Sequence, residues 1–165
     1  MVLRLFSDQL RLSLWVNRFF ILLEYEKYKE TTNNILKIAE RNKDTLSIAK
    51  AESYLGDYFF SLSKNDSAFY YYLKSEKKFN RKKDKSSLAE AILHKAYILL
   101  FEKDFVGSES ETIKVLNIAK DLKNNSLIYE CYINLGSSLS GLGNYEKALE
   151  YYQKSLVQIK NIFLQ

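Results

Sequence analysis

The sequence repeats with a period of about 40 residues, and this long period constrains the fold more than any other feature. The tripeptide Tyr-Glu-Lys at residues 25–27 returns at residues 145–147, which is three periods later. Small residues follow the same spacing at Gly56, Ala96 and Gly136. A fixed period of roughly 20–50 residues is typical of stacked supersecondary units rather than of a single globular core.

The composition favours helices for these units. The chain has 165 residues, no proline and five glycines, and both of these residue types weaken helix interiors. Four periods account for nearly the whole chain, so we expect one elongated domain over residues 1–165. Each unit is expected to hold two helices, about eight in all, with unit bounds near residues 5–40, 45–80, 85–122 and 125–163.

Polar segments are expected to separate the helices. Gly143-Asn144 predicts a turn in which glycine ends one helix and asparagine caps the next. Asn125 and Ser126 are predicted to cap the first helix of the fourth unit, and residues 87–90 have the pattern of a capping box. Gly107 is expected to delay the second helix of the third unit.

Two of the four units carry a more specific pattern. The fourth has a leucine-glycine pair, then an aromatic, alanine, aromatic and small residue: Leu135-Gly136, Tyr145, Ala148, Tyr152 and Ser155. The second unit has Leu55-Gly56, Ala68, Tyr72 and Ser75. These units resemble the tetratricopeptide repeat (TPR). In the third unit Lys95 and Thr112 replace the leucine and the aromatic, and in the first Tyr28 stands where alanine would.

The resemblance implies an all-α, right-handed superhelical solenoid of stacked antiparallel helix pairs. The concave face of such a solenoid is lined by the first helix of each pair and binds peptides or partner proteins. The long period, without the closing proline, resembles the longer variant found in bacterial sensory and regulatory proteins. In those proteins such arrays often precede a histidine-kinase or DNA-binding domain, and no such second domain is present in these 165 residues.

A helical-wheel projection identifies the residues that the first helices would present on the concave face. Equivalent positions of stacked units would form two rows, namely Tyr54, His94, Asn134 and Asp57, Tyr97, Ser137. The remaining candidates on the same face are Lys50, Ser53, Glu90 and Glu130. Aromatic rings beside polar groups suit recognition of a peptide. The alternative is an ordinary solvated helix face.

The sequence lacks the residue patterns of an enzyme, a metal site or a cofactor site. His94 is the only histidine and Cys131 the only cysteine. No Gly-rich phosphate loop and no pair of histidines at helical spacing is present. Cys131 cannot form an intrachain disulfide and is expected to be an inert thiol on a helix. We therefore expect a non-catalytic adaptor that uses no cofactor and no metal.

The net charge of +5 is concentrated in residues 74–85, which we call the basic patch. Seven lysines and arginines outnumber two acidic residues there, so this segment alone accounts for the charge of the whole chain. Binding of nucleic acid through this patch is the least favoured function, because cations also suit the C-terminal end of a helix and its turn.

Both ends of the chain are apolar. The run at residues 12–23 is too short to span a bilayer, so we expect an ordinary helix of a cytoplasmic protein with no membrane partner. The chain finishes with Ile159, Ile162, Phe163 and Leu164. Because solenoids normally end in a polar cap, this predicts self-association through the terminal helices. A second reading is a sensory or regulatory segment that docks within a larger bacterial signalling protein.

Overall fold

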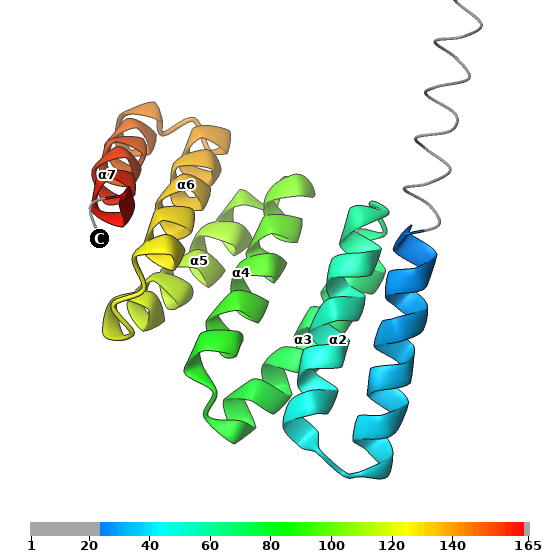
Figure 1. Ribbon diagram of the computed structural model, residues 1–165. Helices are drawn as coiled ribbons and strands as arrows, with labels where there is room; N and C mark the ends of the chain where they lie inside the picture. Colours follow the sequence, from blue (N-terminus) through cyan, green and yellow to red (C-terminus); the bar gives the residue numbers. More distant parts are fainter. Residues whose placement is uncertain (1–23, 164–165) are drawn as a thin grey trace, which may run out of the picture.

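The computed structural model describes residues 24–163, which fold into helices joined by short turns (Figure 1). Residues 24–41 are helical. The six helices that follow are α2 (Thr45–Ser61), α3 (Asn65–Lys82), α4 (Lys85–Phe101), α5 (Phe105–Asp121), α6 (Asn125–Gly141) and α7 (Tyr145–Phe163). The expected all-α solenoid of helical repeats is therefore confirmed. The further helix expected within residues 5–23 lies outside the described residues.

The turns between these helices share one backbone geometry. One residue in each has a positive φ, between 53° and 79°: Lys43, Ser63, Lys83, Lys103, Lys123 and Gly143. These positions are evenly spaced, at half of the sequence period. The left-handed conformation allows the backbone N–H of the following residue to hydrogen-bond to a carbonyl group of the preceding helix. Asp44 N, for example, donates to the Ala39 carbonyl at 2.9 Å. Each turn therefore closes one helix and starts the next over a very short connection.

The residue after each left-handed position marks the start of the next helix. The side chains of five of these residues accept backbone N–H groups of the next helix: Asp44, Asp84, Asp104, Asn124 and Asn144. The turn predicted at Gly143-Asn144 is confirmed, with Gly143 at φ 79° and Asn144 accepting from Lys147 N.

Three details of the expected helix starts are wrong. Asn124, rather than Asn125 or Ser126, caps α6. Asp84 caps α4 in place of the capping box at residues 87–90, because its carboxylate accepts the Ser87 N–H at 3.2 Å. Gly107 lies inside α5 and donates its N–H to Asp104, so it does not delay the helix.

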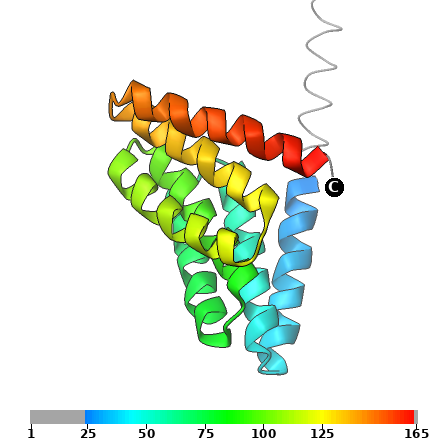
Figure 2. The same ribbon diagram turned by 90° about the vertical axis from the view of Figure 1, so that its left-hand side faces the viewer.

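The helices form two layers. Each helix from α2 to α7 packs on the next in the chain, and α4 additionally contacts both α2 and α6. Within residues 45–163, no contact joins α3 to α5 or α5 to α7. Because helices crowd together on the inside of a curved array and spread on its outside, α2, α4 and α6 form the inner layer. Figure 2 views this array from the end that carries α6 and α7.

Two glycines permit close packing within helix pairs. A Cβ atom added to Gly56 would lie 2.6 Å from the ring of Tyr72, and one added to Gly136 would lie 2.6 Å from the ring of Tyr152. The missing side chain of Gly136 therefore lets α7 approach α6 closely. The main core lies between α4, α5 and α6 and contains Ala89, Ile92, Leu93, Val115, Leu116, Ala119, Leu127, Ile128, Cys131 and Leu135.

Two ionic clusters connect α3 to the inner layer. The Glu52 carboxylate of α2 is 3% exposed and pairs with Lys74 at 3.1 Å and Lys78 at 2.6 Å. The Lys95 ammonium of α4 is 7% exposed and pairs with Glu76 of α3 at 2.6 Å and Glu111 of α5 at 3.5 Å. The second cluster therefore links three consecutive helices.

Protonation of Glu111 should weaken the fold in acid. Burial opposes ionisation of this carboxyl, but its bond to Lys114 and the charge of Lys95 outweigh burial and lower its pKa below 4.5. Because the pKa is lower in the folded state, the stabilisation is full above pH 4.5 and is lost as the pH falls through the folded-state value. We expect Glu111→Gln to flatten the decline of unfolding free energy between about pH 5 and pH 3, measured by urea denaturation. An unchanged decline would contradict this role.

Candidate functional site

Four of the expected concave-face residues form a continuous row across the inner layer. Asp57 Oδ1 of α2 lies 3.4 Å from His94 Nδ1 of α4. The His94 and Tyr97 rings are 6.3 Å apart, and the Tyr97 hydroxyl donates to Glu130 of α6 at 2.9 Å. We call Asp57, His94, Tyr97 and Glu130 the inner row. It joins α2, α4 and α6 through side chains that remain partly exposed.

Tyrosines fix the carboxylates of the inner row. The Tyr72 hydroxyl donates to Asp57 Oδ1 at 2.7 Å, and the Tyr72 ring lies 4.9 Å from the ring of His94. Burial, followed by the nearby Asp57 charge, raises the pKa of Tyr72 well above its usual range. Burial and Glu130 raise the pKa of Tyr97 in the same way. Both phenols therefore stay protonated and hold their carboxylates in one orientation.

The structure places most of the other candidates on the same surface. Lys50, Tyr54 and Glu90 are exposed, while Ser53 and Ser137 are half-buried. The two predicted rows are not separate, however. The contact from Asp57 to His94 runs diagonally between them, and Tyr97 contacts Glu130, which belongs to neither predicted row.

Asn134 is not on the open surface, and its expected placement there is wrong. Its side chain is 1% exposed, and its Nδ2 donates to Ser108 at 3.0 Å and to Thr112 at 2.6 Å. The cause is the helix behind it. His94, the equivalent of Asn134 one unit earlier, meets the bulky ring of Tyr72 and stays outside. Asn134 meets the smaller Thr112 and enters the core.

The site also contains tyrosines from the second helices, which the wheel of the first helices could not show. Tyr28 is 40% exposed and lies edge-on to Tyr54, with ring centres 6.5 Å apart. The Tyr152 hydroxyl lies 3.3 Å from Ser137 Oγ. The size of the Tyr28 side chain could have indicated its place in the site, because alanine is the usual residue at this position of the repeat.

The thiol of Cys131 should be unreactive in the folded protein. Its side chain is buried, and burial followed by the charge of Glu130 raises the pKa of Cys131 to about 12. Since the thiolate is the reactive form, we expect labelling by a disulfide reagent at pH 8 to be at least ~100-fold slower in native buffer than in urea. Colorimetric release of the reagent's thiol measures both rates. Equal rates would contradict this burial.

Metal binding, membrane insertion and nucleic-acid binding each find little support in the described part of the chain. Within residues 24–163, no three His, Cys, Asp or Glu side chains gather closely enough to hold a metal ion. None of the described helices is both long and apolar enough to cross a membrane. In the basic patch, Lys74 and Lys78 already pair with Glu52. Lys77 lies within α3, and Arg81, Lys82, Lys83 and Lys85 surround the turn after α3.

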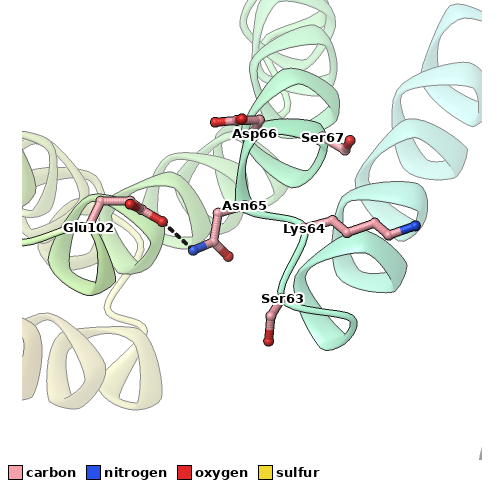
Figure 3. A pocket seen from close by; sticks show the side chains of 6 residues that line it. All are labelled: Ser63, Lys64, Asn65, Asp66, Ser67 and Glu102. Atoms are coloured by element: carbon pink, nitrogen blue, oxygen red, sulfur yellow. Dashed lines mark hydrogen bonds between the residues drawn. The ribbon is translucent and has the colours of Figure 1, made fainter.

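A polar depression lies at the turn between α2 and α3 (Figure 3). It is lined by Ser63, Lys64, Asn65, Asp66, Ser67 and Glu102. The Asn65 amide points toward α4 and donates to the Glu102 carboxylate. Gln158 of α7 makes the same kind of bond to Asn125 of α6, at 2.7 Å. We interpret the depression as a polar contact between neighbouring helices rather than as a binding site.

Comparison with known proteins agrees with the fold. Residues 129–159 match the family model of the tetratricopeptide repeat. A search of curated protein sequences found no match. Among solved structures, BtubC (BKLC) from P. vanneervenii is similar, with a TM-score of 0.76 and 19% identity over 84% of this chain and 58% of that chain. The present chain therefore spans little more than half of BtubC.

Two further structures are similar. The TPR domain of Arabidopsis FLU has a TM-score of 0.66 and 19% identity, covering 72% of this chain and 98% of that chain. The MamA protein has a TM-score of 0.57 and 16% identity, covering 82% of this chain and 73% of that chain. At these identities the similarity establishes the fold alone.

Proposed function

We propose that this chain, in which residues 129–159 match the tetratricopeptide repeat, is a protein-interaction scaffold whose inner surface binds an extended segment of a partner protein. The observation that carries this proposal is the inner row. Its four side chains link three helices of the inner layer and remain partly exposed. A surface that presents aromatic rings and polar groups in one line suits an extended polypeptide.

The inner surface is also ordered before a partner arrives. Tyr72 holds Asp57, and Tyr97 holds Glu130, so these carboxylates lose little conformational freedom on binding. Exposed Lys50, Tyr54 and Glu90 flank them and are available for contact. Preorganisation of this kind reduces the entropic cost of association and so favours binding of a flexible segment.

A matched pair of tyrosine variants tests the proposal. Tyr54 on the inner surface is 43% exposed, and Tyr70 of α3 in the outer layer is 55% exposed. The full chain would be used to capture partners from lysate of the source cells, followed by affinity measurement on the purified partner. We expect Tyr54→Ala to weaken binding at least ~10-fold, the loss of a well-placed aromatic contact, and Tyr70→Ala to leave it unchanged. Equal affinities for both variants would exclude the inner surface.

The exposed face of α7 supports a second candidate, a regulatory segment that docks within a bacterial signalling assembly. Leu149, Leu156 and Val157 are 58%, 63% and 61% exposed on this last helix. Such a face suits a further helical unit or a second copy. Light scattering of the purified chain should then show self-association that Leu156→Glu removes. A monomer over the accessible concentration range would count against docking of a second copy.

A further inference from the structure

A depression between the helix of residues 24–41 and α2 has a composition unlike the rest of the inner surface. It is lined by Glu24, Tyr25, Tyr28, Asp57, Tyr58 and Ser61, and we call it the tyrosine–carboxylate pocket. Three of these residues are tyrosines and two are acidic. No lysine or arginine is among the described residues that line it. The pocket adjoins the inner row, because Asp57 belongs to both.

The carboxylate of Asp57 is positioned and accessible. Its side chain is 40% exposed. Oδ1 accepts the hydrogen bond from Tyr72 and lies 3.4 Å from His94, which fixes the plane of the group. Within the described part of the chain, Oδ2 is engaged in no hydrogen bond or ion pair. One oxygen is therefore held by the protein while the other remains available to a ligand.

Tyr25 and Tyr28 supply ring surface beside this charge, whereas Tyr58 is 4% exposed. Tyr28 is 40% exposed and lies against Tyr54. Its pKa is raised by partial burial and then by Asp57 and Tyr54, so its ring remains a neutral phenol close to the carboxylate. A cation gains from such ring faces and from carboxylates together, and it gains more where water is partly excluded.

The protein itself contains a lysine that contacts a tyrosine ring and a carboxylate at the same time. Lys29 Nζ lies 5.3 Å from the ring centre of Tyr58 and 3.9 Å from the Glu26 carboxylate. The Tyr58 hydroxyl in turn donates to Glu26 at 2.8 Å. A lysine of this protein thus contacts a tyrosine of the pocket, Tyr58, together with the Glu26 carboxylate beside it, and neither Lys29 nor Glu26 is a lining residue.

We infer that the tyrosine–carboxylate pocket binds a lysine or arginine side chain of the partner segment. This inference rests on the proposed function, since it assigns a chemistry to one end of the inner surface. The charge distribution agrees with it. The inner surface carries Asp57, Glu90 and Glu130 against Lys50, whereas the protein as a whole has a net charge of +5. A basic segment is therefore attracted to the inner surface and repelled by the basic patch.

The test uses three capped tripeptides as probes, with a central arginine, lysine or citrulline between glycines. Citrulline keeps the shape of arginine but carries no charge. Each peptide would be titrated into the isotope-labelled full chain, and amide and tyrosine ring resonances followed by NMR. We expect the arginine and lysine peptides to shift resonances of residues 24–28 and 54–61, with affinity falling as salt rises. We expect no saturable shift with the citrulline peptide.

Matched variants assign the effect to the pocket. Asp57→Asn keeps the shape and the acceptor for Tyr72 but removes the charge, and Asp66→Asn changes an exposed carboxylate outside the pocket. We expect Asp57→Asn to weaken the binding of the arginine peptide at least ~5-fold and Tyr28→Leu to weaken it at least ~3-fold. Asp66→Asn should leave this affinity unchanged. Equal shifts from the citrulline peptide, shifts centred elsewhere, or full affinity in Asp57→Asn would overturn the inference.

These outcomes are distinct from failure of the proposed function. If a captured partner depends on Tyr54 but binds Asp57→Asn normally, the inner surface binds protein and the cation pocket is wrong. If the cationic peptides bind as expected and no partner depends on Tyr54, the pocket stands and the scaffold function is wrong. Thermal unfolding of each variant verifies that the fold is retained.

Discussion

Replacement of Gly56 by leucine should destabilise the protein by about 3 kcal/mol or more, measured as the free energy of unfolding in urea. A Cβ at this position would lie 2.6 Å from two ring carbons of Tyr72. The Tyr72 ring cannot move aside easily, because Tyr72 is 1% exposed, its hydroxyl is hydrogen-bonded to Asp57 and its ring packs against His94. The clash therefore moves α3 away from α2 and disturbs the inner row at the same time.

The equivalent change in the last unit provides the control. Gly136 faces Tyr152 at the same distance, but Tyr152 is only half-buried and its ring has room to swing outward. We expect Gly136→Leu to reduce stability by about 1–2 kcal/mol, less than Gly56→Leu. Alanine at either position should be milder still, since its better helix propensity offsets about 1 kcal/mol of the clash. A larger loss at Gly136 than at Gly56 would show that the Tyr72 ring is not the rigid element.

Replacement of Lys95 by methionine should lower the free energy of unfolding by about 3 kcal/mol. The methionine fills a similar volume, so the loss comes from charge rather than from a cavity. Glu76 and Glu111 would then face each other across a largely buried site with no cation between them. The same cation also lies 5.5 Å from the ring centre of Phe69 in α3.

Two further variants separate charge from burial. Lys114 contacts the same Glu111 at 2.6 Å but is 57% exposed, so Lys114→Met should change stability by less than about 0.5 kcal/mol. Adding Glu76→Gln and Glu111→Gln to Lys95→Met removes the repulsion and should restore most of the loss. Urea denaturation at neutral pH compares the four proteins. If the triple variant is as unstable as Lys95→Met, the lysine acts through packing and not through its charge.

The fold could be predicted from the sequence because the strongest sequence signals are local. The repeat period, the lack of proline and the Gly143-Asn144 turn all act within one or two helices, and the solenoid is confirmed. The errors at Asn125 and at residues 87–90 have a local cause as well. The left-handed residue sets where each helix starts, and in five of six turns it is lysine or serine rather than the glycine that usually marks such a position.

The site was harder to predict, because exposure depends on residues that are distant in sequence. His94 and Asn134 occupy equivalent positions on equivalent helices. One is partly exposed and the other is 1% exposed, because Tyr72 blocks the first and Thr112 admits the second. A wheel of one helix contains no information about the size of the side chain behind it. For the same reason it could not place Tyr28 beside Asp57.

The even spacing of the left-handed residues also bears on how such a chain can change its length. Since the junctions from Lys43 to Gly143 recur once every half unit, gain or loss of a whole unit leaves each remaining helix on its own side of the array. A gain of half a unit would keep every junction intact yet exchange the concave and convex roles of all helices beyond it. Whole-unit duplication is therefore the in-frame route by which the groove can grow, and half-unit duplication would turn its binding residues outward.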